Sequence, residues 1–243
     1  MKKALITGGA GFVGTALIKR LLKKYPSIEI VSIDNYSSGY KSNHIKSKKV
    51  IYLEKDTQTL IPKKFDVNNT KSDIADVFEP DVVFHFGEFS RIVTSFDAFD
   101  NCWDFNMQGT KLVLDYCVAK KAKLIYSASS SKFGNDGKDE NLSPYAWMKA
   151  KMVELINNYA EWFNLKFEIT YFYNAYGSGQ VRTGDYATVI GIFEEQYSKG
   201  EPLTVVEPGE QSRDFTHIND IVSGVILAAE KGQQGEYPLG TGI

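Results

Sequence analysis

Short apolar runs alternate with longer helical patterns along most of the chain. The runs have the length and the continuous apolar character of strands that are buried on both faces. Alternation of this kind predicts a parallel sheet, because each parallel strand needs a crossover connection. Six strands are expected, at Ala4–Thr7, Ile28–Ile33, Val50–Leu53, Asp81–Phe86, Leu124–Ser127 and Phe167–Tyr171.

Helical patterns fill the intervals between these strands. The first runs from Phe12 to Lys24 and carries its leucines on one face. Further helices are expected at Asp73–Phe78, Asn106–Lys120 and Tyr145–Phe163. This order of elements predicts an α/β fold with a doubly wound parallel sheet of the Rossmann type, with helices on both faces.

The regular alternation of predicted strands and helices ends after residue 173. A helix is expected at Tyr186–Lys199 and a short strand at Leu203–Val206, before a helix and a strand that can rejoin the main sheet. We therefore divide the chain into a sheet domain (residues 1–173), a small lobe (174–212) and a returning helix and strand (213–243).

The composition is that of an ordinary globular protein and narrows the class of partner. The formal net charge of −2 over 243 residues gives no reason to expect nucleic acid or an anionic membrane. Cys102 and Cys117 form no Cys-x-x-Cys pair, so neither a disulfide nor a metal site is expected. No apolar run is long enough to span a bilayer, and glycines interrupt the apolar N-terminal stretch, unlike a signal peptide. A cytoplasmic protein is therefore expected.

The turn between the first strand and the first helix is rich in glycine. Gly8, Gly11 and Gly14 have the spacing G-x-x-G-x-x-G. Glycines let the backbone turn tightly and approach a pyrophosphate, which then lies at the positive helix N-terminus, beside Phe12 and Val13. Because the motif joins a strand to a helix, it predicts a dinucleotide site.

An acidic residue at the end of the second strand indicates which dinucleotide is bound. Asp34 can accept hydrogen bonds from the ribose hydroxyls and repel a 2′-phosphate, which favours NAD over NADP. Residues 1–173 are thus the predicted dinucleotide-binding domain, and residues 174–212 the substrate lobe. Four nearby lysines leave NADP as an alternative: Lys41, Lys46, Lys48 and Lys49.

Tyr145 and Lys149 lie one helical turn apart and form a candidate catalytic pair. A free tyrosine has a pKa near 10, and a neighbouring ammonium together with a positive nicotinamide ring stabilises its phenolate. Serines 127 and 129–131 end the fifth predicted strand, and ligands bind at the carboxyl ends of such strands. One of these hydroxyls can therefore bind a substrate oxygen near the tyrosine.

With these motifs the sequence resembles the extended short-chain dehydrogenase/reductase family, specifically its NAD-dependent nucleotide-sugar epimerases and dehydratases, such as UDP-glucose 4-epimerase. The resemblance covers almost the whole chain. It implies that Ser129 completes a Ser-Tyr-Lys triad with Tyr145 and Lys149. It also implies further cofactor-binding residues, which are Asn35, Asp56, Thr57, Phe86 and Gly87.

The same resemblance implies a binding site for a nucleotide-diphosphate sugar. Asn174 and Arg213 lie in segments similar to the family motifs that contact the diphosphate, and a guanidinium fork matches phosphate oxygens. The alternative for Arg213 is a surface ion pair with Asp214. The implied substrate-binding residues are Ser90, Ser129, Ser130, Asn174 and Arg213.

Three features depart from the family pattern. Ser130 and Ser131 stand where dehydratases usually carry an Asp-Glu pair, so dehydration is disfavoured. Glu88 stands beside the cofactor site, where members usually have a small residue. Members usually continue for several tens of residues beyond the position of Ile243, so a shortened C-terminal lobe is expected.

The motifs and the family resemblance together predict an NAD-dependent epimerase that acts at C4 of a nucleotide sugar through a transient 4-keto sugar. A net reductase or dehydrogenase with the same triad, and an NAD-binding scaffold without turnover, are the alternatives. A homodimer that associates through the helices at Asn106–Lys120 and Tyr145–Phe163 is expected.

Overall fold

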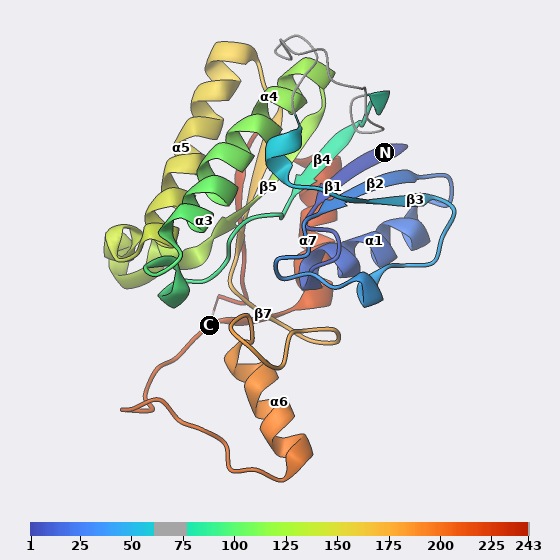
Figure 1. The fold of residues 1–243 in the computed structure, drawn as a ribbon. Helices are drawn as coiled ribbons and strands as arrows, with labels where there is room; N and C mark the ends of the chain where they lie inside the picture. The colour runs from blue at the N-terminus through green and yellow to red at the C-terminus, as the bar shows by residue number, and fades with distance from the viewer. Residues whose placement is uncertain (61–76, 243) are drawn as a thin grey trace.

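The computed structural model describes residues 1–60 and 77–242, with the backbone alone for residues 134–138. A seven-stranded sheet runs through it in the order β3-β2-β1-β4-β5-β6-β9, with every pair parallel (Figure 1). The order reverses between β1 and β4, which is where ligands bind in doubly wound sheets. The strands are β1 (Lys3–Thr7), β2 (Glu29–Asp34), β3 (Val50–Glu54), β4 (Val82–His85), β5 (Lys123–Ser129), β6 (Phe167–Phe172) and β9 (Glu236–Leu239).

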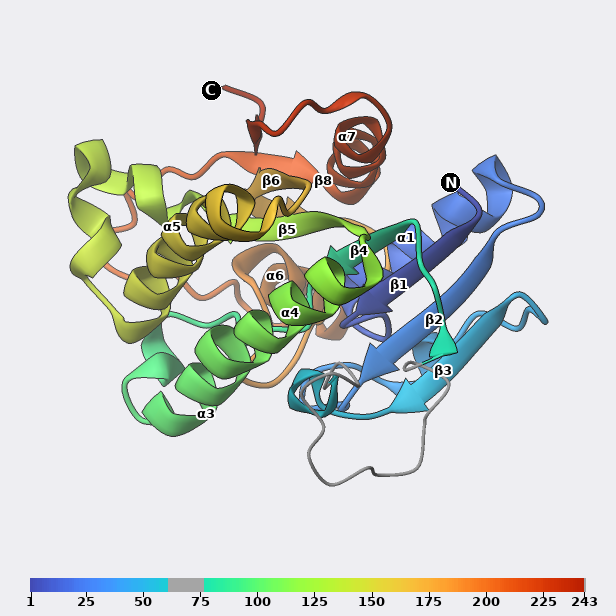
Figure 2. The same cartoon turned by 90° about the horizontal axis from the view of Figure 1, so that it is seen from above.

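Helices cover both faces of this sheet, so the predicted doubly wound fold is confirmed (Figure 2). Successive residues of a strand point to opposite faces, and β1 shows this directly. Ala4 and Ile6 pack with α1 and α7, whereas Leu5 packs with α4 and α5. These helices are α1 (Phe12–Lys24), α4 (Thr110–Lys120), α5 (Pro144–Phe163) and α7 (Ile218–Lys231).

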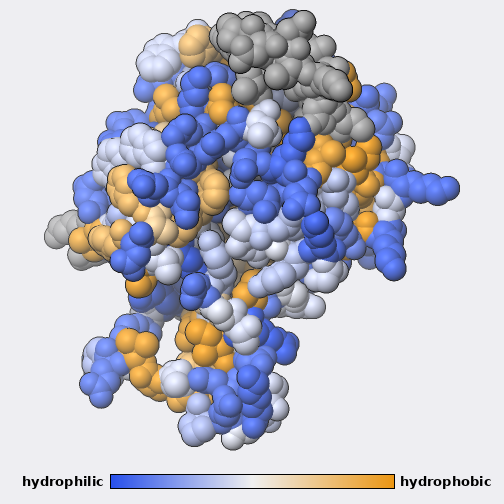
Figure 3. All heavy atoms as spheres, viewed as in Figure 1, coloured by the Kyte–Doolittle hydropathy of each residue, from blue (hydrophilic) through white to orange (hydrophobic). Residues whose placement is uncertain are grey.

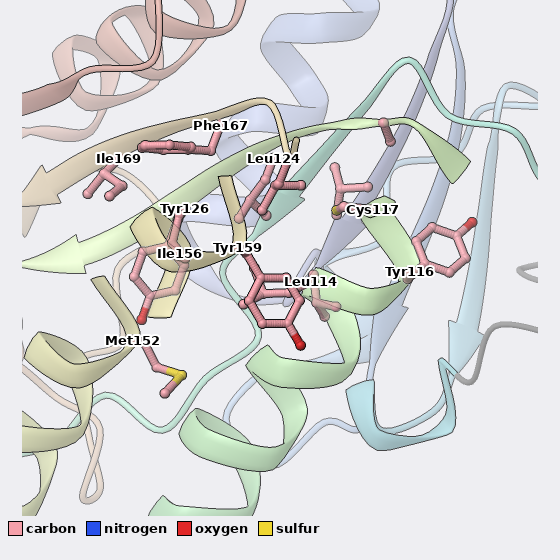
Figure 4. Packing of buried hydrophobic residues seen from close by; sticks show 14 of the residues in the cluster. Leu114, Tyr116, Cys117, Leu124, Tyr126, Met152, Ile156, Tyr159, Phe167 and Ile169 are labelled. Carbon is pink, nitrogen blue, oxygen red and sulfur yellow. The ribbon is translucent and has the colours of Figure 1, made fainter. Parts of the chain in front are cut away.

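The core on the α4 and α5 face anchors the helix that carries the candidate catalytic pair. Tyr126 and Ile169 of the sheet pack against Met152 and Ile156 of α5 and against Leu114 of α4 (Figure 4). Burying an apolar side chain of this size contributes about 1.5–3 kcal/mol. The position of α5 on the sheet is therefore set by several such contacts.

The segment before α4 is helical but not continuously α-helical. It consists of α3 (Phe99–Trp103) and a π-helical turn, η5 (Asp104–Gly109), where an uninterrupted helix was expected from residue 106. Buried Asn106 lies on this turn, and it accepts a 2.7 Å hydrogen bond from the Phe89 N–H and donates a 3.0 Å bond to the Phe89 carbonyl. The turn thereby clamps the backbone that follows β4.

The C-terminal part contains a second, two-stranded parallel sheet. It pairs β7 (Asn174–Tyr176) with β8 (Phe215–His217), and α6 (Val189–Lys199) lies outside the main sheet, at the lower end of the molecule (Figure 1). The returning segment adds β9 to the main sheet beside β6, as predicted. The domain boundaries at residues 174 and 213 stay predictions.

The strand predicted at Leu203–Val206 is wrong. This segment has no strand, and Thr204 instead exchanges two 3.1 Å hydrogen bonds with the Gln196 amide of α6. Val205 and Val206 are 68% and 79% exposed, and apolar residues gather on this part of the surface (Figure 3). Apolar and β-branched composition favours a strand only when a neighbouring strand takes up its hydrogen bonds.

Smaller differences concern helix ends and short elements. The helix predicted from Tyr186 begins at Val189, and the one predicted at Asp73–Phe78 falls largely outside the described residues. Three short 3-10 helices and one longer one complete the described part: η1 (Lys41–Asn43), η2 (Thr57–Thr59), η4 (Val93–Ser95) and the 12-residue η6 (Ser130–Asn141).

Candidate active site

A cavity of about 1060 Å³ lies at the carboxyl ends of β1, β4, β5 and β6. Pockets for small molecules usually measure about 300–1000 Å³, so this volume is at the upper end of that range and suits a large ligand. Every predicted cofactor and substrate residue except Asp56 lines it. These residues are Gly8, Gly11, Phe12, Val13, Gly14, Asp34, Asn35, Thr57, Phe86, Gly87, Ser90, Ser129, Ser130, Tyr145, Lys149, Asn174 and Arg213.

The glycine loop is packed so tightly that side chains cannot replace two of its glycines. Gly8 has a φ of +71°, and a Cβ there would lie 2.8 Å from the backbone of Phe86 and Gly87. A Cβ at Gly14 would lie 2.2 Å from the Gly8 carbonyl oxygen. The loop is thus wedged between the end of β4 and the first turn of α1.

The N-terminus of α1 leaves hydrogen-bond donors for a ligand. Its N-cap is Gly11, which supplies no side-chain acceptor for the first N–H groups, those of Phe12 and Val13. Unsatisfied N–H groups and the positive end of the helix dipole together form an anion site. The geometry therefore fits the pyrophosphate of a dinucleotide.

Asp34 is fixed by the loop that it faces. Its two carboxylate oxygens accept hydrogen bonds from the Ala10 N–H at 2.9 Å and the Tyr36 N–H at 2.8 Å. Burial raises the pKa of Asp34, and these two bonds oppose that rise by favouring the carboxylate. Asp56, which does not line the cavity, accepts a 2.6 Å bond from the Asn35 amide and so orients a side chain that does.

A buried polar chain connects the strand before the glycine loop to α5, the helix that carries Tyr145 and Lys149. Thr7 Oγ1 accepts from the N–H groups of Phe86 and Gly87, at 3.1 and 3.0 Å, so its own proton points to His85 Nδ1 at 2.7 Å. His85 must then carry its proton on Nε2, which lies 2.9 Å from Thr110 Oγ1. Thr110 in turn donates to Glu88 at 3.0 Å.

His85 in this chain is neutral and structural. It is fully buried, and the loss of solvation lowers its pKa to about 4. Its ring therefore carries hydrogen bonds from one threonine to the other and does not exchange protons at neutral pH.

The chain ends at a buried ion pair between Glu88 and Lys149. The two side chains are 2% and 6% exposed, and Glu88 also accepts a 2.9 Å hydrogen bond from the Tyr126 hydroxyl. The Lys149 ammonium additionally donates to the Ser127 carbonyl and lies 4.7 Å from the centre of the Tyr126 ring. Lys149 is thus held rigidly, with its charge matched by a carboxylate. The sequence signalled Glu88 only as a departure and gave no sign of this pairing.

Tyr145 is placed by the precise start of α5. Ser143 caps the helix by accepting a 3.1 Å bond from the Ala146 N–H, and Pro144 begins it. The Tyr145 N–H donates to Ser95 Oγ at 3.3 Å, and its ring belongs to a cluster with Phe89. Both contacts tie the first turn of α5 to the segment after β4.

The Ser129 hydroxyl is prepared to donate a hydrogen bond. Its oxygen accepts from the Ser131 N–H at 3.2 Å and from the Ser131 hydroxyl at 2.9 Å. Both lone pairs are therefore used, and the hydroxyl proton is what Ser129 can offer to a ligand oxygen.

The substrate end of the cavity contains an unpaired arginine where an ion pair was one alternative. The Asp214 carboxylate accepts from the N–H groups of Thr241 and Gly242, and these bonds lower its pKa. Among the described residues Arg213 bonds only the Ser212 carbonyl, at 2.7 Å, so the ion pair with Asp214 is not formed. Asn174 donates to the Asp214 carbonyl at 3.2 Å.

Several further side chains line the cavity without having been predicted from the sequence, among them Arg91, Tyr186 and Gln180. The Arg91 guanidinium lies over the Tyr186 ring, and Gln180 has a buried amide whose nitrogen and oxygen find no partner in the described part of the chain. No local pattern in the sequence marks Arg91, because the Asp185 carbonyl that it bonds lies 94 residues away in the chain.

Within residues 1–60 and 77–242, no cluster of three or more potential ligands could hold a metal ion. No helix in the same part of the chain has the length and apolar character needed to cross a membrane.

A glycine loop at the switch point of a parallel sheet, an acid at the end of β2 and a Tyr-x-x-x-Lys helix define a short-chain dehydrogenase/reductase. More closely, the chain belongs to the NAD-dependent epimerase/dehydratase family, whose sequence model matches residues 4–240. Family membership confirms NAD as the predicted cofactor.

Relatives within this family catalyse different reactions. The chain is 30% identical to the UDP-N-acetyl-alpha-D-glucosaminuronate decarboxylase of Bacillus cytotoxicus, over 97% of this chain and 73% of that protein. Its structure is similar to the UDP-glucose 4-epimerase of Thermotoga maritima with UDP-glucose, with a TM-score of 0.88, 25% identity and coverage of 99% and 77%. It is also similar to the UDP-glucose 4-epimerase of Thermus thermophilus with NAD, with a TM-score of 0.81 and 25% identity. That match covers 99% of this chain and 78% of the other.

The first prediction concerns the choice of dinucleotide. We expect the protein to bind NAD at least about tenfold tighter than NADP, because Asp34 repels a 2′-phosphate. In Asp34→Asn, which keeps the shape and loses the charge, this ratio should shrink in calorimetric titrations. Glu29→Gln, an exposed acid at the opposite end of β2, is the matched control and should leave the ratio unchanged. NADP binding as tightly as NAD to the wild type would contradict the assignment.

The second prediction concerns pH and stability. The folded-state pKa of His85 is about 4, below the value of about 6.5 for a free histidine, so protons bind preferentially to the unfolded chain. The contribution of His85 is therefore complete above about pH 6.5 and is lost as the pH falls toward 4, a loss on the order of 3 kcal/mol. Across this pH range, the free energy of unfolding measured with urea should decline more steeply for the wild type than for His85→Gln. Equal slopes would refute it.

The third prediction concerns the Glu88–Lys149 pair. Glu88→Gln leaves the buried ammonium without its counter-charge and should lower the free energy of unfolding by about 3–5 kcal/mol. Adding Lys149→Met should recover part of this loss, which urea unfolding of the four proteins in a double-mutant cycle measures. The exposed pair Lys151–Glu154 on the same helix is the control, with an expected coupling below about 1 kcal/mol. Similar coupling in both cycles would mean that the buried pair has no special role.

Proposed function

We propose that the protein is a nucleotide-sugar epimerase that inverts C4 of the sugar with tightly held NAD. The observation that carries this proposal is the arrangement of Ser129 and Tyr145 on the wall of the cavity that the glycine loop also lines, with no carboxylate at positions 130 and 131. The similarity to two UDP-glucose 4-epimerases, one with UDP-glucose and one with NAD, supports it.

The side chains divide the work as follows. Tyr145 removes the proton from the 4-hydroxyl of the sugar, while Ser129 donates a hydrogen bond to the same oxygen. Bound NAD supplies the hydride acceptor and later the hydride donor. Asn174 and Arg213 hold the diphosphate, so that the sugar can turn in the cavity and expose its other face.

Epimerisation needs no further acid or base, whereas elimination of water does. Ser130 and Ser131 offer hydroxyls where an acid–base pair would be required. Glu88 is a carboxylate near the site, but Lys149, Thr110 and Tyr126 already occupy its oxygens. Dehydration is therefore the less favoured reaction.

Decarboxylation is a second candidate because of the Bacillus cytotoxicus relative. It shares the first step, since a ketone at C4 lies β to a carboxylate carried on C5 and lets that group leave as CO₂. The expected homodimer and the cytoplasmic location also stay predictions.

The fourth prediction tests the reaction itself. The purified protein, without added nicotinamide, should interconvert two UDP-sugars epimeric at C4, and a deuterium at C4 should be retained because the same hydride returns. Tyr145→Phe should lower turnover by about 10²–10⁴-fold and leave NAD binding intact. Tyr159→Phe on the same helix, whose hydroxyl bonds Asp115 outside the cavity, is the control and should remain active.

Each competing reaction has its own signature in this experiment. Build-up of free NADH with loss of the label would indicate a dehydrogenase. Release of CO₂ from a uronic acid derivative would indicate a decarboxylase. NAD binding without turnover of any nucleotide sugar would indicate a scaffold.

A further inference from the structure

Arg91 places a guanidinium in the cavity with only neutral partners. Its Nε donates to the Asp185 carbonyl at 3.1 Å and a terminal nitrogen donates to the Ser90 carbonyl at 3.0 Å. In the described part of the chain no carboxylate pairs with it. The Arg91 side chain is half-buried, and partly removing a cation from water without a counter-charge costs free energy, which a bound anion can offset.

The guanidinium is also held in place before any ligand arrives. It lies 5.3 Å from the centre of the Tyr186 ring, and Tyr186 packs edge-on against Phe89. The Phe89 backbone is itself clamped by buried Asn106. Because the arginine is anchored both by the segment after β4 and by the segment before α6, little conformational freedom remains to be lost on binding.

Arg91 belongs to the end of the cavity where Tyr145 lies. Phe89, which contacts Tyr186, is in one apolar cluster with Tyr145. Burial lowers the pKa of Arg91, but a guanidinium remains protonated at neutral pH. Lys149 at the same end is matched by Glu88, which leaves Arg91 as a cation there that a ligand can pair.

We propose that Arg91 binds a carboxylate on the sugar, so that the preferred substrate is a nucleotide-diphosphate derivative of a uronic acid. This inference rests on the proposed function, in which Tyr145 reaches the oxygen on C4. A carboxylate on C5 is attached to the carbon next to the reacting one, and it therefore lies close to whatever surrounds Tyr145. The planar guanidinium fork matches a carboxylate, whereas the neutral CH₂OH group of a hexose cannot compensate its charge.

The test compares two ligands that differ only at C6, UDP-glucuronate and UDP-glucose. Calorimetric dissociation constants are measured in the presence of NAD for the wild type, Arg91→Met, Arg91→Lys and Arg213→Met. The wild type should bind UDP-glucuronate at least about tenfold tighter, as expected for a charge-assisted hydrogen bond. Arg91→Met should bring the ratio close to one by weakening UDP-glucuronate, and Arg91→Lys should retain part of the preference.

Arg213→Met is the matched control, because a diphosphate contact serves both ligands. It should weaken both by a similar factor and leave their ratio unchanged. If Arg91→Met weakens both ligands equally, Arg91 holds the diphosphate or only the segment around it, and the inference is overturned. Unchanged NAD binding and thermal unfolding in each variant show that the fold is intact.

The proposed function and this inference fail in different ways. A wild type that binds and epimerises UDP-glucose but shows no preference for UDP-glucuronate overturns the inference alone. A wild type that retains NAD and binds neither UDP-sugar overturns the proposed function, and the inference with it.

Discussion

The buried polar chain from Thr7 through His85, Thr110 and Glu88 to Lys149 is the constraint on which the rest of the site depends. It joins β1, β4, α4 and α5, and its members are almost inaccessible to water. A buried donor or acceptor that loses its partner costs about 1–3 kcal/mol, so no link can shift alone. The loop that receives the dinucleotide and the helix that carries Tyr145 are therefore held in one fixed relation.

Much of the fold and of the candidate site could be predicted, because local patterns specify it. The strand–glycine–helix sequence at Gly8 to Gly14, the acid at Asp34 and the spacing of Tyr145 and Lys149 are each readable within a few residues. Other features depend on contacts that no local pattern encodes. Glu88 pairs with Lys149, 61 residues away in the chain, and Arg91 bonds the Asp185 carbonyl, 94 residues away. The apolar segment at 203–206 pairs with no strand in the described part of the chain.

The two ends of the cavity are built with different rigidity. The dinucleotide end rests on buried strands and on a loop without space for side chains. The other end adjoins α6, whose N-cap Thr188 lines the cavity. Gly191 is the single buried residue among those described in α6, and residues 197–213 are exposed. Regions with few buried contacts open at low free-energy cost, so changes of substrate can be accommodated there without disturbing the cofactor site.

The contacts of Asp214 couple the edge of the sheet to the position of Arg213, the residue proposed to hold the diphosphate. This carboxylate is bound by Thr241 and Gly242, just beyond the edge strand β9, and it directly follows Arg213 in the chain. Fraying of β9 would release Asp214 and allow the neighbouring Arg213 to leave its position beside the cavity. Heat or denaturant that frays β9 should consequently weaken the affinity for a nucleotide sugar before the whole protein unfolds.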